Sequence, residues 1–170
     1  MTGLIAASGN IMSLLNFSDT LTDNAFINLF YNCKSLTTAP ELPATILANS
    51  CYAYMFSGCS SLTAAPALPA TTLADNCYAE MFNDCTALVQ APELPATTLA
   101  NSCYRQLFGF CSNLNYVKAM FTTITGNSLA NWLFRVSETG TFVKNASATW
   151  DNTDAGIPSG WTVQTASPDK

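Results

Sequence analysis

The residues best able to do chemistry in this 170-residue chain are seven cysteines. They recur every 26 residues in two columns, which are Cys33, Cys59, Cys85 and Cys111, and Cys51, Cys77 and Cys103. This spacing differs from the Cys-x-x-Cys pairs of metal and redox sites, and the chain has no histidine to complete a zinc site. We predict no metal and no cofactor, and expect free thiols packed in the core as small apolar groups. Disulfides within a column are the alternative, because neighbours one coil apart would lie roughly 5 Å from each other.

Carboxylates offer a second kind of chemistry, because a pair held in a cleft can act as acid and base. Glu41 and Glu93 occupy the same repeat position two coils apart, roughly 10 Å by strand spacing, with Ala67 between them. A ladder of like charges would repel, so we interpret this pattern as a surface that avoids a third charge.

Two further patterns argue against an active site. Residues 151–154 with Gly156 lack the alternating spacing and the final Glu of a calcium loop, so we expect a turn there. A nucleophilic Ser or Cys would have no histidine as its general base. We therefore predict that the protein is not an enzyme.

These residues must be positioned by an internal repeat. Residues 39–64, 65–90 and 91–116 are three copies of one sequence, with a period of 26 residues and no insertions. A fixed period of about 20 to 50 residues is typical of stacked repeats, in which each unit buries its apolar face against its neighbours.

Each copy divides into two kinds of segment. Short extended segments, bounded by proline, are expected at Leu36–Ala39, Leu62–Ala65 and Leu88–Ala91. Apolar residues at helical spacing follow, as in Leu73, Cys77, Tyr78, Met81, Phe82 and Cys85. The predicted fold class is therefore an α/β repeat, a gently curved solenoid of short parallel strands with helices on its outer side.

Both ends of the chain carry weaker copies, as expected of capping repeats. We predict one domain over residues 1–170: a degenerate coil at 1–38, three full repeats at 39–116, and a degraded coil with a cap at 117–170. In the last part, Leu133-Phe134 lies 26 residues beyond Leu107-Phe108. The cap should contain strands at Gly140–Val143 and Gly160–Gln164, with Trp132, Trp150 and Trp161 as a lid over the last coil.

Composition limits the partners. Charged residues are 10% of the chain, and a net charge of −5 leaves no basic stripe for nucleic acid. The longest apolar run near the start is too short to span a membrane and lacks the basic flank of a signal peptide. We expect either a mature product or a fragment.

One unit of the repeat resembles the BspA-type leucine-rich repeats of bacterial surface proteins. It reads Met-Phe-x-x-Cys-x-x-Leu over residues 81–88, followed by Leu94-Pro95, and the resemblance covers residues 13–134. The family pattern is a few residues shorter, because the proline corner is expanded here. Segments 139–144 and 156–161 also look like the carboxy-terminal cap of such proteins in anaerobic gut bacteria. The resemblance implies a leucine-rich-repeat adhesion or recognition module on the cell surface or outside the cell, with no catalytic residue.

Surface positions that vary between copies are where a repeat protein can encode a ligand. On the predicted strand face, the candidate ligand-binding residues are Thr38, Thr63, Val89, Gln90, Asn115 and Tyr116. We expect them to bind a protein or glycan on a host or neighbouring cell. The alternatives are sequence drift on an indifferent surface and a structural spacer in a larger surface or phage-appendage protein.

Overall fold

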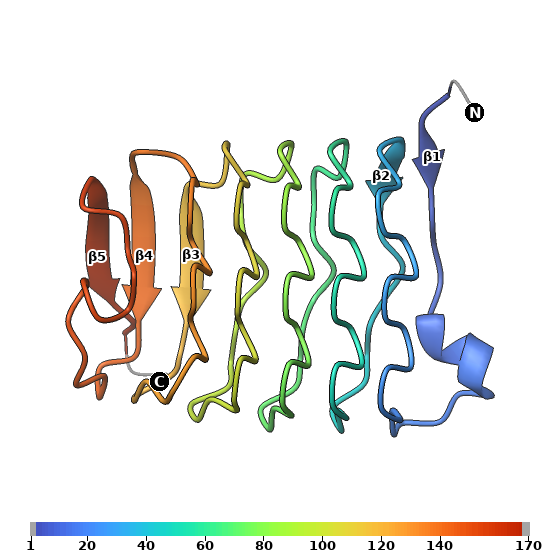
Figure 1. Ribbon diagram of the computed structural model, residues 1–170, viewed down its shortest axis with the longest axis horizontal. Coiled ribbons are helices and arrows are strands. Elements are labelled where there is room, and N and C mark those ends of the chain that lie inside the picture. Colours follow the sequence, from blue (N-terminus) through green and yellow to red (C-terminus); the bar gives the residue numbers. More distant parts are fainter. Residues whose placement is uncertain (1–2, 168–170) are drawn as a thin grey trace.

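The computed structural model describes residues 3–167, so the outermost ends of the predicted domain, 1–2 and 168–170, lie outside it. Its coils stack in one row from the amino to the carboxyl end (Figure 1). The elements are β1 (Ile5–Ala6), the 3-10 helix η1 (Ile11–Leu15), β2 (Leu36–Thr38), β3 (Tyr116–Ala119), β4 (Gly140–Lys144) and β5 (Trp161–Thr165). Parallel pairs form one sheet of β1 and β2 and another in the order β3-β4-β5.

The predicted fold class is wrong in its main feature, because residues 3–167 contain no α-helix. The segments expected as outer helices are runs of consecutive turns. In the central copy, the N–H groups of Ala79 and Met81 donate to the carbonyls three residues earlier, at 3.1 and 3.2 Å. The intervening N–H groups of Glu80 and Phe82 donate instead to the next coil, to the carbonyls of residues 105 and 107, at 2.8 and 3.0 Å.

The backbone angles explain why the spacing was misleading. Every fourth residue of the central copy has a positive φ, at Asn76 (54°), Glu80 (54°) and Asp84 (60°), whereas a helix needs about −63° throughout. The buried residues therefore recur with a period of four. A helix has a period of about 3.6, and over some ten residues the two periods differ by only about one position. The apolar pattern therefore cannot distinguish a helix from a run of turns with a period of four residues.

Proline limits the strands on the opposite side of the coils, because it has no N–H to donate to a ladder. β2 matches the first expected strand, but the strands expected at Leu62–Ala65 and Leu88–Ala91 are only single bridging residues, Thr38 to Ala64 and Gln90 to Tyr116. The carboxyl-terminal coils lack this proline, and β3, β4 and β5 pair over four and five residues.

Losing the proline also shortens one coil. Gln90 bridges a residue 26 positions later, whereas Leu94 bridges Ala119, 25 positions later. The predicted equivalence of Leu133-Phe134 with Leu107-Phe108 is therefore wrong by one residue. Trp132 and Leu133 are buried, and Phe134 is 46% exposed.

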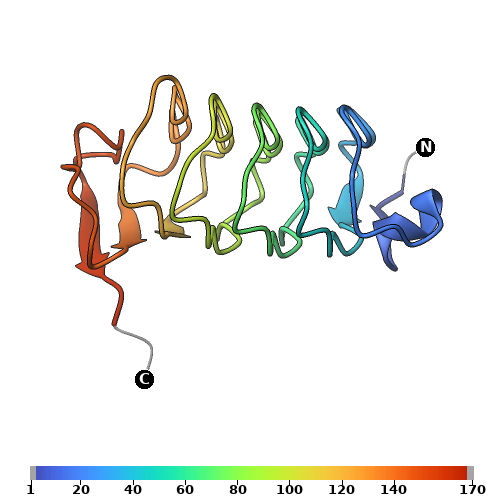
Figure 2. The same cartoon turned by 90° about the horizontal axis from the view of Figure 1, so that it is seen from below.

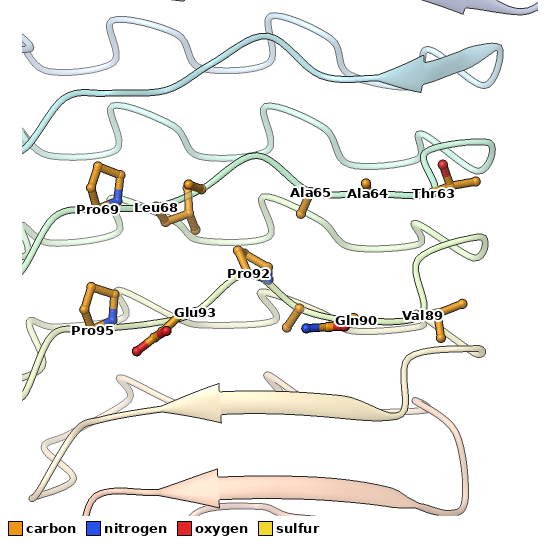
Figure 3. A pocket seen from close by; sticks show the side chains of 12 residues that line it. Thr63, Ala64, Ala65, Leu68, Pro69, Val89, Gln90, Pro92, Glu93 and Pro95 are labelled. Carbon is orange, nitrogen blue, oxygen red and sulfur yellow. The ribbon is translucent and has the colours of Figure 1, made fainter. Parts of the chain in front are cut away.

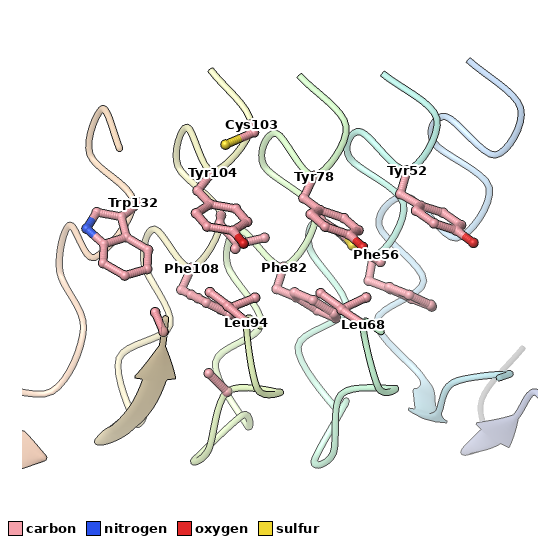
Figure 4. Packing of buried hydrophobic residues seen from close by; sticks show 14 of the residues in the cluster. Tyr52, Phe56, Leu68, Tyr78, Phe82, Leu94, Cys103, Tyr104, Phe108 and Trp132 are labelled. Carbon is pink, nitrogen blue, oxygen red and sulfur yellow. The ribbon is translucent and has the colours of Figure 1, made fainter. Parts of the chain in front are cut away.

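Two columns of stacked rings run through the core between the turns and the strands (Figure 4). Successive rings of Phe30, Phe56, Phe82 and Phe108 lie 5.4–5.7 Å apart. The second column is Phe26, Tyr52, Tyr78 and Tyr104, and it ends against Trp132 at 6.2 Å.

The last coils are closed by the three tryptophans of the expected lid, all of them buried. Each indole N–H donates to a backbone carbonyl: Trp132 to Ala155 at 2.7 Å, Trp150 to Phe121 at 3.1 Å and Trp161 to Ser137 at 2.8 Å. Figure 2 shows the coils from below, with β5 at the far end of the stack. β5 pairs with β4, and β4 pairs with β3.

Substitutions at Asp84 distinguish turns from a helix. In a helix, Gly would cost about 1 kcal/mol and Val less. At a positive φ the order reverses: Asp84→Gly should be neutral or stabilising, and Asp84→Val should cost roughly 1–2 kcal/mol. Urea unfolding of the two variants measures this. A Gly variant that is less stable than the Val variant would contradict the turn assignment.

Stacking on both sides should make the central rings the most costly to remove. Phe82→Ala should lower the free energy of unfolding by about 3–5 kcal/mol, because it opens a cavity between Phe56 and Phe108. Phe30→Ala is the matched control, since Phe30 is only partly buried and has one ring neighbour in its column. It should cost clearly less, and equal losses would show that stacking does not set the energy.

Candidate functional site

The six predicted ligand-binding residues are spread over four coils and differ in exposure. Thr38, Thr63, Val89, Gln90 and Asn115 are exposed, and Val89 is 49% exposed although it is apolar. Tyr116 is half-buried, because it begins β3 and pairs with β4. The isolated bridges from Thr38 to Ala64 and from Gln90 to Tyr116 place them in two neighbouring columns of the stack.

A groove of about 690 Å³ brings three of them together (Figure 3). It runs between two successive coils, and Thr63, Val89 and Gln90 stand at one end of it. Thr38, Asn115 and Tyr116 are not among its lining residues.

Most of the groove wall consists of residues that sequence reasoning did not propose as a site. They are small or rigid apolar residues with one acid, chiefly Ala64, Ala67, Pro69, Pro92, Glu93 and Pro95. The signal for them was the repeated Ala-Pro-x-Leu-Pro, which we interpreted only as a corner. Proline breaks the ladder between coils, and the same break leaves a hollow between successive corners.

The hollow repeats along the stack. A second groove of about 400 Å³ lies one coil earlier, lined by Pro40, Glu41 and Pro43 together with Pro66, Ala67 and Pro69. Ala67 and Pro69 line both grooves, so the two are continuous. We call the combined surface the proline groove.

Charge in the proline groove lies at its two ends. Glu41 is exposed, and Glu93 pairs with Lys118 at 2.9 Å. Because both partners of this pair are partly exposed, it contributes little to stability. Ala67, which takes the Glu position between them, leaves the centre of the groove apolar.

The cysteines form no chemical centre. All seven are free thiols, and six are buried. Cys59, Cys85 and Cys111 each donate to a carbonyl of the preceding coil at 3.0–3.2 Å. Within residues 3–167, no group of three or more Cys, Asp or Glu could hold a metal ion.

Burial strongly suppresses ionisation of the thiols. It raises the pKa of Cys51 to about 11 and the pKa of Cys59, Cys103 and Cys111 to about 12. The pKa values of Cys77 and Cys85 are also raised far above the ordinary value by burial. Because the thiolate is the reactive form, these six side chains are chemically inert in the folded protein.

The acidic segment before β5 forms a turn. The side chain of Asp151 accepts a hydrogen bond from the N–H of Asp154 at 2.8 Å, and its carbonyl accepts one from Ala155 at 3.1 Å. Within the described residues, no helix is long and apolar enough to cross a membrane.

Comparison with protein-family models, with curated proteins and with solved structures found no match.

The buried thiols should make the protein sensitive to alkali. The pKa of these thiols is higher in the folded chain than in the unfolded chain. Their contribution to the free energy of unfolding is therefore complete below about pH 8.5 and is lost as the pH rises above that value. Each thiol that ionises only on unfolding removes about 1.4 kcal/mol per pH unit. Urea unfolding at several pH values from neutral to about pH 10 measures the slope.

The control for this prediction is Cys85→Ala. It should be less stable than the parent at neutral pH because of the cavity, yet its stability should fall less steeply with rising pH. An unchanged slope would contradict the assignment of the alkaline loss to buried thiols.

Proposed function

We propose that the protein is a non-enzymatic recognition module, and that the proline groove is where it binds a protein ligand. The observation that supports this proposal is a continuous hollow, apolar at its centre and charged at its ends, on the side of the coils that carries the strands. Concave, largely preformed surfaces with apolar walls and few polar groups are typical of binding sites.

The chemistry of the groove favours a protein over a glycan. Its walls are mainly prolines and alanines, with Leu42, Leu68 and Val89, and no aromatic residue lines it. Aliphatic walls suit apolar side chains, whereas sugar recognition depends on many directed polar groups. Gln90 and Thr63 at one end can accept and donate hydrogen bonds to a peptide backbone or side chain.

Rigid proline walls also reduce the entropic cost of binding. Proline has a fixed φ and little side-chain freedom to lose, so a wall of prolines is ordered before the ligand arrives. The groove repeats with the coils, which suits an extended ligand that follows the stack.

A location on the cell surface or outside the cell is part of this proposal. It rests on the resemblance of residues 81–88 and the following Leu94-Pro95 to BspA-type bacterial surface proteins. Outside the cell, thiols meet oxidants, and six of the seven cysteines are buried with little thiolate to react. The core chemistry is therefore compatible with an oxidising environment.

The second candidate function is a structural spacer in a larger surface or phage-appendage protein. It is favoured by the stacking itself: rings, turns and thiols of each coil contact the next at regular distances throughout the row. A spacer would need that rigidity and would make no use of the proline groove.

Binding should depend on the end of the groove that Thr63, Val89 and Gln90 form. The double variant Val89→Ser/Gln90→Ala removes one apolar and one polar contact from it, and should weaken binding at least about tenfold, because the two lost contacts together cost about 1.4 kcal/mol or more. The matched control is Thr97→Ala/Thr98→Ala, a pair of exposed residues on the same coil that do not line the groove. The measurement is capture of host and bacterial surface proteins, with a glycan array run in parallel.

The outcomes separate the candidates. Retention of a protein that the groove variant loses and the control keeps would support the proposal. Capture of glycans alone would show that the ligand is a glycan and not a protein. Equal loss in both variants would move the site away from the groove, and a parent protein that retains nothing on either panel would favour the spacer.

A further inference from the structure

The feature that points beyond the proline groove is an open row of backbone donors at the carboxyl-terminal end of the turns. We call the stacked turn segments, residues 24–33, 50–59, 76–85, 102–111 and 127–136, the turn column. Along it, alternate N–H groups of each coil donate to carbonyls of the coil that follows. Among residues 3–167, no full coil follows the last coil of the column.

The equivalent donors identify the open row. In the fourth coil, the N–H groups of residues 104, 106, 108 and 110 donate to the carbonyls of residues 128, 130, 132 and 134, at 3.0, 2.8, 2.9 and 2.7 Å. In the fifth coil the same positions are Leu129, Asn131, Leu133 and Arg135, where positive φ values recur at Asn131 and Arg135. Their N–H groups make no hydrogen bond to another residue among 3–167.

The row is open because the final coil is short. β3 pairs with residues of β4 that lie 25 positions later, whereas β4 pairs with residues of β5 only 21 positions later. The segment before β5 therefore cuts across instead of forming a complete run of turns. It leaves a groove of about 730 Å³, lined on one side by Leu129, Asn131 and Leu133 to Arg135, and on the other by residues 156 and 158–160.

A ligand for this groove must present carbonyls at the spacing of the turns. Alternate residues of a turn segment lie closer together than alternate residues of a strand, which advances about 3.3 Å per residue. A fully extended peptide would therefore fall out of register, and a chain in the same consecutive-turn conformation would match every donor. That conformation needs a positive φ at every fourth residue, which Asn and Gly adopt most readily.

A second copy of the chain is excluded by its own strands. Its first coil carries the complementary carbonyls, but β1 and β2 would overlap β4 and β5 if that coil stacked in register on residues 127–136. Both sheets lie at the extreme ends of the stack in Figures 1 and 2. The occupant must be a shorter segment.

We propose that the groove over residues 129–139 binds a turn-forming segment of another protein, with Asn or Gly at every fourth residue, whose backbone carbonyls accept from Leu129, Asn131, Leu133 and Arg135. The exposed ring of Phe134, which packs edge-on against Phe110 at 5.4 Å, offers an apolar contact beside it. This is main-chain recognition by an open ladder, as in strand addition to a sheet edge, with turns in place of strands.

The probe is a synthetic peptide of residues 22–32 of this chain, which has Asn24, Asn28 and Asn32 at positive φ in the first coil. Amide hydrogen exchange is followed in the full chain with and without it. In the free protein, the amides of Leu129, Asn131, Leu133 and Arg135 should exchange at least about a hundredfold faster than those of residues 104, 106 and 108. The peptide should slow these four amides and leave the others unchanged.

Three variants sharpen the test. A peptide with Val in place of Asn24 and Asn28 should bind at least about tenfold more weakly, because Val resists a positive φ. Ser159→Trp, which fills the groove from its far wall, should weaken binding of the parent peptide by a similar factor. Ser147→Trp is the matched control at an exposed serine outside the groove, and should leave the affinity unchanged.

Slow exchange of the four amides in the free protein would overturn the open row. Failure of the parent peptide to bind at about 1 mM, or binding without protection of these amides, would overturn the docking site. Equal binding of the Val peptide would overturn the requirement for turns. The proline groove lies elsewhere on the coils, so none of these results bears on the proposed function.

Discussion

The whole structure depends on two alternating kinds of hydrogen bond from the backbone N–H groups. In the turn column, every second N–H closes a turn within its own coil, and the N–H groups between them donate to the next coil. In the coils before the last one, nearly all N–H groups of the turns are thereby paired without helix or sheet, as burial requires. Because the bonds between coils recur at each repeat, they fix the spacing of the coils, and the rings and thiols stack at that spacing.

This arrangement requires a positive φ at every fourth residue, and the sequence meets the requirement only in part. Asn, Ser, Gly and Asp occupy many of these positions, but Tyr54, Glu80, Gln106, Phe110 and Arg135 hold others. Left-handed backbone costs such residues roughly 1–2 kcal/mol each. Side-chain contacts across coils offset some of this strain: Arg105 binds Glu80 at 2.8 Å and Tyr54 at 3.3 Å, and the Arg135 guanidinium lies over Phe134.

The 26-residue period made the stacking of the coils predictable, but it did not determine the local backbone conformation. The 26-residue period identifies which residues share a column, so the buried cysteines and rings follow from the sequence. The prediction of helices was wrong, because pairs such as Cys77-Tyr78 and Met81-Phe82 fit a period of four residues as well as a period of 3.6. Only Thr63, Val89 and Gln90 of the candidate site were reached through variable positions. Most of the lining, including Pro69, Pro92 and Pro95, was missed because a repeated proline indicates a corner and does not predict the hollow beside it.

In the turn column, the backbone hydrogen bonds between coils all run in one direction, from the N–H groups of one coil to the carbonyls of the next. The two ends of the turn column are therefore chemically different. Carbonyls of the first coil, such as those of Ala25 and Ile27, accept no bond from another described residue. In the last coil, every second N–H group, from Leu129 to Arg135, donates none to another described residue. A helix has the same polarity at its termini and needs caps there. In this chain the tryptophans close the core, yet they do so through indole bonds to carbonyls and leave the backbone donors of residues 129, 131, 133 and 135 open. In a stack of turns, covering the apolar core and pairing the backbone N–H groups of the last coil are therefore separate requirements. The carboxyl-terminal coil meets only the first.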